Sequence, residues 1–201
     1  KETSRPWGGA APTPLRAPSP PLSRRICAKF TMGTGLGAPG GFVSQRTIDY
    51  YEARARGGTG LIIVEGSSPG ARSSFGNQLS LGDDQHIEGL RNLSEAVHKH
   101  GAKIAIQLMH AGMQLMDGRP TQVSPSAVIC LHRNIGIGGQ PPHELTLDEI
   151  AEIVQWYADA ARRAKEAGFD GVEMNGAHQY IIAAFLSGAS NVRTDKYGGT
   201  P

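Results

Sequence analysis

The chain has 201 residues, 39% of them hydrophobic, which suffices for one domain of ordinary size. Its 20 basic and 18 acidic residues give a net charge of +2 and are spread along the chain, so the sequence predicts no nucleic-acid-binding face. No apolar run is long enough to span a bilayer. We see no export signal, and only two cysteines, Cys27 and Cys130, are present, so a cytoplasmic protein is expected.

The first part of the chain differs in texture from the rest. Residues 1–25 are rich in Pro, Ala and Ser and show neither helical nor strand periodicity, so we expect a disordered or poorly ordered segment. Residues 26–201 are expected to form the single domain. It opens with a candidate strand, "RICAKFTM" at 25–32, which leads into a glycine-rich loop, "GTGLGAPGG".

Helix and strand patterns then alternate along the chain. Three segments have helical periodicity and a capping residue before them: 45–56 after Ser44, 85–100 after Asp83 or Asp84, and 147–167 after Thr146, which pairs with Glu149 in a capping box. Glycines end each helix, and the short apolar runs that follow have the character of buried strands: 60–66, 102–108 and 169–174. This alternation predicts an α/β fold with parallel strands and right-handed crossovers.

Two architectures fit this pattern, namely a doubly wound open sheet and a (β/α)₈ barrel. Four strands would be half of such a barrel. After residue 174 the sequence offers only a short helix-like run at 181–187 and a loop. Either the sheet is small, or the chain stops early.

A dinucleotide-binding site is one candidate. Gly35, Gly37 and Gly40 match the pattern G-x-G-x-x-G after a strand, and Glu65 ends the next strand, where a ribose-binding acid would be expected. A phosphate-binding glycine turn must lead directly into its helix, however, and here the residues Gly-Phe-Val intervene before Ser44. A flexible surface loop explains the glycines at least as well.

A second candidate site lies at the carboxyl ends of the strands, where the loops of parallel α/β folds converge. The four ends read "TMGT", "VEGS", "QLMHAG" and "MNGAHQY". The planar amide of Gln107 carries both a donor and an acceptor, which suits the pyrimidine edge of a flavin. Ordinary structural roles also fit: Gln107 could satisfy neighbouring backbone, His110 could cap a turn, and Gly33 or Gly66 could permit a bend.

The fourth strand end is the most distinctive. If the chain turns after this strand, Asn175, His178 and Tyr180 converge, which gives two donors for a carbonyl oxygen and one phenolic proton. A phenol ionises near pH 10 and can therefore act as an acid at neutral pH.

From Met32 onward the sequence resembles the Old Yellow Enzyme, or NADH:flavin oxidoreductase, family, in particular its enoate-reductase and dienoyl-CoA-reductase-like branch. The matching segments occur in the family's order: "MGTGLG", "TIDYYEARARGGTGLIIVEG", "IQLMHAG" and "GFDGVEMNGAHQYIIAAFLSGASNVRTDKYGG". The last segment includes a phrase similar to the family's Asn-x-Arg-x-Asp-x-Tyr-Gly-Gly, which we interpret as loop-fixing residues: Asn191, Arg193, Asp195, Tyr197, Gly198 and Gly199.

The resemblance implies the N-terminal half of an FMN-binding TIM (β/α)₈ barrel, whose flavin is reduced by NADH or NADPH. Its implied site residues are, for the cofactor, the backbone of Thr31, Met32, Gly33 and Gly66 and the side chain of Gln107, and for the substrate, Asn175 and His178 on the carbonyl oxygen with Tyr180 as proton donor. The implied substrate is a small α,β-unsaturated carbonyl compound. No metal site is expected, and an iron–sulfur cluster would require sequence farther downstream.

The sequence departs from the family at several positions. Thr31 stands where a Pro is usual, Gly33 where many relatives carry Thr or Cys, Asn175 where a His is usual, and Met113 where an Arg is common. An amide still donates hydrogen bonds, so polarisation of a carbonyl should survive at Asn175.

The length is the largest departure, because the family's barrel continues through four more strands. A half barrel leaves sheet edges uncovered, so we expect a fragment of a longer protein, with pairing of two copies as another way to cover the edges. The sequence thus predicts a flavin-dependent ene-reductase, and the alternative is a non-catalytic or inactive truncated fragment that binds flavin or another ligand.

Overall fold

The computed structural model describes residues 28–29, 31–70, 73, 76–115, 122–128 and 141–199. Residues 1–25, expected to be disordered, lie outside this part of the chain, as do both cysteines. The regular elements are β1 (Ala28–Lys29), η1 (Pro39–Gly41), α1 (Gln45–Arg56), β2 (Leu61–Ser67), η2 (Asp84–His86), α2 (Ile87–His98), β3 (Lys103–Leu108), η3 (Gly112–Gln114), β4 (Val123–Ser124), β5 (His143–Glu144), α3 (Leu147–Glu166), β6 (Gly171–Met174) and α4 (Ile181–Leu186).

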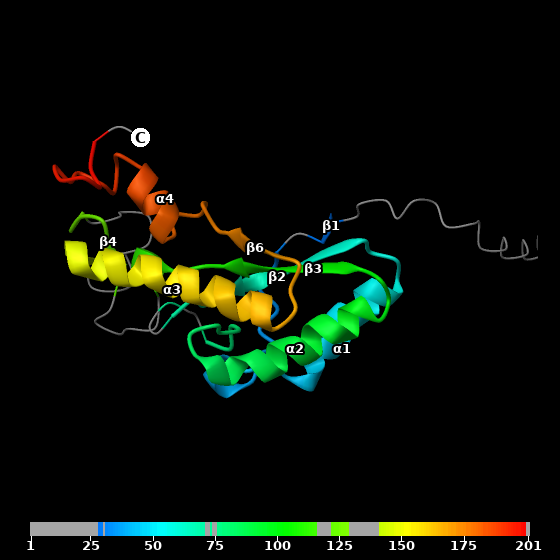
Figure 1. Cartoon of the computed structure of the whole chain (residues 1–201). Coiled ribbons are helices and arrows are strands. Elements are labelled where there is room, and N and C mark those ends of the chain that lie inside the picture. The colour runs from blue at the N-terminus through cyan, green and yellow to red at the C-terminus, as the bar shows by residue number, and fades with distance from the viewer. Residues whose placement is uncertain are drawn as a thin grey trace, which may run out of the picture.

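The main sheet has four parallel strands in the order β1-β2-β3-β6 (Figure 1). Each strand therefore lies beside the next main strand along the chain. A doubly wound sheet reverses its strand order at a switch point, whereas a barrel keeps adding strands on one side. The observed order confirms the barrel alternative, and the sheet with its helices forms part of a (β/α)₈ barrel.

The local signals at the helix starts act as predicted. Ser44 accepts a hydrogen bond from the backbone N–H of Thr47 before α1, and Thr146 and Glu149 form both bonds of a capping box before α3. Asp83 caps the short 3₁₀ turn η2 instead, so α2 begins at Ile87, two residues later than predicted. No helix in the described residues is both long and apolar enough to cross a membrane.

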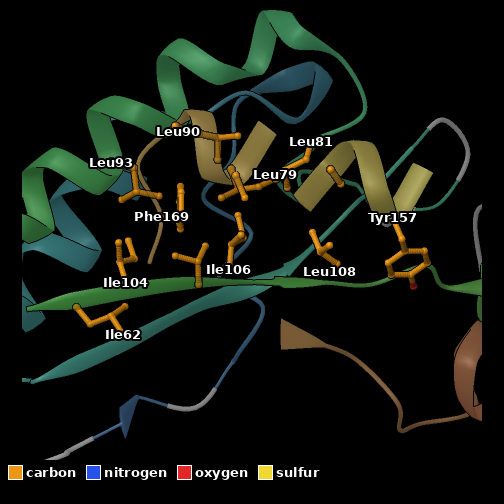
Figure 2. Close-up of a cluster of buried hydrophobic side chains, with 14 of the residues drawn as sticks. Ile62, Leu79, Leu81, Leu90, Leu93, Ile104, Ile106, Leu108, Tyr157 and Phe169 are labelled. Atoms are coloured by element: carbon orange, nitrogen blue, oxygen red, sulfur yellow. The ribbon is translucent and has the colours of Figure 1, made fainter. Parts of the chain in front are cut away.

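The hydrophobic core fills the space between the sheet and the helices (Figure 2). Ile104, Ile106 and Leu108 project from β3 toward α2 and α3, where they meet Leu90 and Leu93. All five side chains are almost completely removed from solvent. Burial of a Leu or Ile side chain contributes about 1.5–3 kcal/mol, so this face holds the helices on the sheet.

The structure differs from the sequence prediction at three further places. Of the predicted strand 25–32, the described residues Ala28–Lys29 form β1, residues 25–27 and 30 lie outside the described part of the chain, and Thr31 and Met32 already belong to a loop. The last main strand begins at Gly171 rather than 169. The insertion before α3 contains a further two-stranded parallel sheet, β4 with β5, which lacks the length to produce a periodic pattern.

The loop after α4 is fixed by polar side chains, as its sequence suggested. Asn191 donates to the carbonyls of Phe185 and Tyr197, at 2.8 and 2.7 Å. The guanidinium of Arg193, only 7% exposed, binds Asp195 and the carbonyl oxygens of Pro125 and Leu145. A side chain at Gly198 would overlap the backbone of Arg193, so a glycine is required there.

Candidate functional site

A polar cavity of about 360 Å³ lies at the carboxyl ends of β2, β3 and β6. Twelve residues line it: Thr31, Gly33, Gly35, Glu65, Gly66, Asn77, Gln78, Gln107, Met109, Asn175, His178 and Tyr180. Every site residue predicted from the sequence is among them except Met32. The side chain of Met32 is 63% exposed. The structure thus brings together residues from four strand ends that are far apart in the sequence.

A chain of hydrogen bonds connects three of these strand ends. Gln107 donates from Nε2 to Oγ1 of Thr31 at 2.9 Å, and its Oε1 accepts from Nδ2 of Asn175 at 3.0 Å. The Oδ1 of Asn175 accepts in turn from the backbone N–H of Ala177 at 3.0 Å. Among the described residues, each primary amide still has one N–H hydrogen without a partner. The two amides are therefore held in fixed orientations and keep donors available to a ligand.

The turn after β6 has an uncommon backbone. His178 and Gln179 both have positive φ angles, 58° and 57°, a conformation that non-glycine residues seldom adopt. The turn is held because Tyr180 N–H donates to the carbonyl of Ala177, and Ile181 N–H donates to that of His110. It places the ring of Tyr180 with its centroid 5.7 Å from that of His178, and both side chains line the cavity.

Glu65 contributes a buried carboxylate to the cavity. Its side chain is 0% exposed, and its Oε2 accepts a short hydrogen bond from the backbone N–H of Thr34. Its Oε1 is buried and has no hydrogen-bond partner among the described residues. The carboxylate therefore ties the loop after β1 to the end of β2 and leaves one acceptor unused.

His110 follows β3 but faces away from the cavity. Its Nδ1 accepts from the N–H of Gly112 at 3.0 Å, so it caps a turn, which was the structural alternative. Its ring stacks on Trp156 with centroids 6.1 Å apart, and burial lowers the pKa of His110 to about 4. The imidazole is thus neutral at physiological pH and packs against α3.

A larger cavity, of about 420 Å³, lies between α3, α4 and the loop that follows α4. Its lining is mainly apolar, with Ile150, Val154, Met174 and Leu186 among the residues, and it contains none of the predicted site residues. We therefore place the candidate site in the polar cavity, where donors and acceptors converge.

Comparison with known proteins agrees with this geometry. The model of the NADH:flavin oxidoreductase / NADH oxidase family matches residues 13–201. The chain belongs to this family. It is 49% identical over 175 residues to an NADH oxidase of Thermoanaerobacter brockii, and 43% identical over 154 residues to an NADPH dehydrogenase of Bacillus subtilis. Its structure matches that of an Old Yellow Enzyme from a Pichia species with a TM-score of 0.79 at 27% identity.

The chain spans less than half the length of these family members. The NADH oxidase match covers 84% of this chain and 26% of the relative, and the NADPH dehydrogenase match covers 76% and 44%. The Old Yellow Enzyme match covers 86% and 47%. Membership of this oxidoreductase family implies FMN as the cofactor, with NADH or NADPH as the reductant.

The cavity has features that fit a flavin. A Cβ atom added at Gly66 would lie 3.1 Å from both Oε1 of Gln107 and Sδ of Met109, so a side chain there would crowd the amide. A Cβ at Gly33 would meet nothing within 4 Å, which leaves open space above the first strand end. Together with the fixed amide of Gln107, these glycines let a flat group approach the backbone closely.

Sequence reasoning missed part of the lining. Asn77 and Gln78 come from the loop between β2 and α2, and Gln78 donates to the carbonyl of Gly66. Met109 lines the cavity beside them. The sequence suggests Glu65 only as a ribose-binding acid, but helix α1 begins at Gln45, well past the glycine pattern that such a site needs. A polar loop without periodicity gives no signal of where it folds back.

Proposed function

We propose that this chain forms the flavin-binding and substrate-protonating part of an ene-reductase, which reduces the C=C bond of small α,β-unsaturated carbonyl compounds. The observation that carries the proposal is the convergence of Gln107, Asn175, His178 and Tyr180 on one cavity. Membership of an FMN-dependent oxidoreductase family supports the cofactor that such a reaction requires.

In this proposal, FMN reduced by NADH or NADPH would supply the hydride that reduces the β-carbon of the substrate. The backbone of Thr31, Met32, Gly33 and Gly66 and the side-chain amide of Gln107 would hold the cofactor. The contact between Gln107 and Asn175 would then join the cofactor-binding and substrate-binding parts of the cavity through a single 3.0 Å hydrogen bond.

Asn175 and His178 would hold the carbonyl oxygen of the substrate. Negative charge develops on this oxygen as the β-carbon gains hydride, and a donor placed there contributes roughly 3 kcal/mol to catalysis. One Nδ2 hydrogen of Asn175 is committed to Gln107, so its second hydrogen is the one available to substrate. Because Ala177 N–H fixes the amide oxygen, the donor keeps its orientation before substrate arrives.

Tyr180 would protonate the α-carbon. Tyr180 is the N-cap residue of α4. The two preceding residues have positive φ angles, and the turn they form brings the Tyr180 side chain beside His178 in the cavity. The uncommon backbone of this turn would therefore serve the reaction, because an extended connection would place the phenol of Tyr180 outside the cavity.

The test begins with the purified chain, which should retain FMN or bind it when it is added. Anaerobic stopped-flow mixing of the reduced, flavin-loaded protein with a cyclic enone should reoxidise the flavin. Tyr180→Phe should slow this reoxidation at least tenfold, because the proton donor is lost. Tyr197→Phe is the matched control, since Tyr197 lies in the loop after α4 and outside the polar cavity.

An unchanged rate in Tyr180→Phe would remove Tyr180 from the acid role. Flavin binding without reoxidation by any enone would favour the alternative, a non-catalytic flavin-binding fragment. The observation that favours this alternative is that the chain spans less than half the length of these family members.

A further inference from the structure

The unpartnered oxygen of Glu65 points to a ligand contact that the proposed roles do not use. A carboxylate accepts hydrogen bonds but donates none, and a buried acceptor without a donor is unfavourable. Here Oε2 is occupied by the N–H of Thr34, while Oε1 has no partner in the described part of the chain. Since Glu65 lines the polar cavity, a molecule bound there can supply the missing donor.

We propose that Glu65 is a cofactor-binding residue, whose Oε1 accepts a hydrogen bond from the bound flavin. This inference rests on the proposed flavin site. A flavin nucleotide carries two kinds of donor, the ring N3–H and the hydroxyl groups of its ribityl chain. Its phosphate is excluded as the partner, because two anions in a buried site repel each other.

Glu173 provides a matched comparison within the same sheet. It is the register partner of Gln107 in the β3–β6 pair, so it occupies the neighbouring strand at the level of the cavity amides. Its Oε2 is also buried and without a partner among the described residues, yet Glu173 does not line the polar cavity. The two carboxylates therefore differ in their access to a ligand.

The substitution Glu65→Gln isolates the unused oxygen. The amide oxygen of Gln can still accept from Thr34 N–H, so the loop after β1 stays tied to β2. The amide nitrogen then takes the place of Oε1 and presents a donor where the flavin also presents a donor. The variant thus keeps the shape of the side chain and replaces the buried, unpartnered acceptor with a donor.

The experiment is equilibrium dialysis of the chain against FMN, riboflavin and lumiflavin, which lacks the ribityl chain. Glu65→Gln should raise the Kd for FMN and riboflavin about tenfold or more, because a hydrogen bond to a charged group is lost. Glu173→Gln should leave it within about twofold. A tenfold effect that persists with lumiflavin assigns the partner as N3–H, and an effect that vanishes with lumiflavin assigns a hydroxyl.

The outcomes separate this inference from the function on which it rests. If the wild-type chain binds flavin and Glu65→Gln binds it equally well, the role of Glu65 is wrong and the flavin site stands. If Glu173→Gln weakens binding as much as Glu65→Gln, the effect is one of general charge, and the contact is again wrong. If none of the flavins binds, both ideas fail. Thermal melting of each variant shows that it is folded.

Discussion

The two faces of the sheet are built from different chemistry. Toward the helices, β2 and β3 present Ile62, Val64, Ile104 and Ile106, all of them 0% exposed and part of the hydrophobic core. On the opposite face the same strands present residues such as Ala105, small and half-buried, and then polar side chains at their carboxyl ends. Alternation along a strand separates the two sets.

The two faces of the sheet therefore have different roles. The helix-covered face is closed by packing and accounts for the stability of the β/α units. The opposite, open face carries Glu65 and Gln107, and their hydrogen-bonding capacity is only partly used among the described residues. A buried polar group is costly unless it is satisfied, and the proposed ligand would satisfy the groups that remain unpaired on this face.

Truncating one isoleucine on each face tests most directly whether the two faces of the sheet contribute differently to stability. Ile104→Ala removes a completely buried side chain and should lower the free energy of unfolding by about 3–4 kcal/mol. Ile63→Ala removes a half-buried side chain from the open face and should cost only about 1 kcal/mol. Equilibrium unfolding in urea measures both values. Equal losses would show that the open face also carries the fold.

Acid should lower the free energy of unfolding through His110, which packs against Trp156 of α3. Burial lowers the pKa of His110 from 6.5 to about 4. Above pH 6.5 the ring is neutral whether folded or unfolded. As the pH falls from 6.5 to 4, only the unfolded chain takes up the proton, so stability should fall by up to about 3 kcal/mol. Urea unfolding at half-unit pH steps measures this, and His110→Asn should flatten the curve in that window. A flat wild-type curve would contradict the burial of the ring.

A second acid-induced loss should follow at lower pH, at the amino-terminal end of the sheet. Burial alone would raise the pKa of Asp170, but hydrogen bonds from Lys103, His98 and the backbone N–H of Ile104 lower it to about 2. Its contribution is present above pH 3.8 and is lost as the pH falls toward 2. The His110→Asn variant should retain this lower step, while Asp170→Asn should lose it.

The smallest expected effect concerns two glycines of the cavity. Gly66→Ala should lower the free energy of unfolding by about 1 kcal/mol and weaken FMN binding, because the new Cβ crowds Gln107 and Met109. Gly33→Ala should change stability by less than about 0.5 kcal/mol, since nothing lies within 4 Å of its Cβ. Thermal melting and dialysis with FMN test both variants. A tolerated alanine at 66 would mean that the amide is less closely fitted than the structure shows.

The fold could be predicted where the signal is local. Helix α1 has the bounds expected from its cap at Ser44 and its glycine stop, and the capping box at Thr146 starts α3 where predicted. The strands β4 and β5 could not be foreseen, because two-residue strands have no period and pair across a long insertion. The alternation of helices and strands did not decide between barrel and open sheet, the family resemblance implied the barrel, and the observed strand order confirms it.

The grouping of the candidate residues around one cavity could be predicted, but their contacts could not. Parallel strands gather their carboxyl ends, so the grouping of Gln107 with Asn175 and Tyr180 followed from topology. The hydrogen bond between Gln107 and Asn175 did not, because it depends on side-chain rotamers on neighbouring strands. The unused oxygen of Glu65 was likewise invisible, since sequence shows a residue's type and not whether its partners are present.

The central claim is that FMN binds on the open, polar face and not in the larger apolar cavity. Hydrogen–deuterium exchange of the chain with and without FMN tests it most directly. We predict slower exchange in residues 31–37 and 175–180, which border the polar cavity. Protection confined to residues 182–199 around the apolar cavity, or no protection at all, would contradict the account.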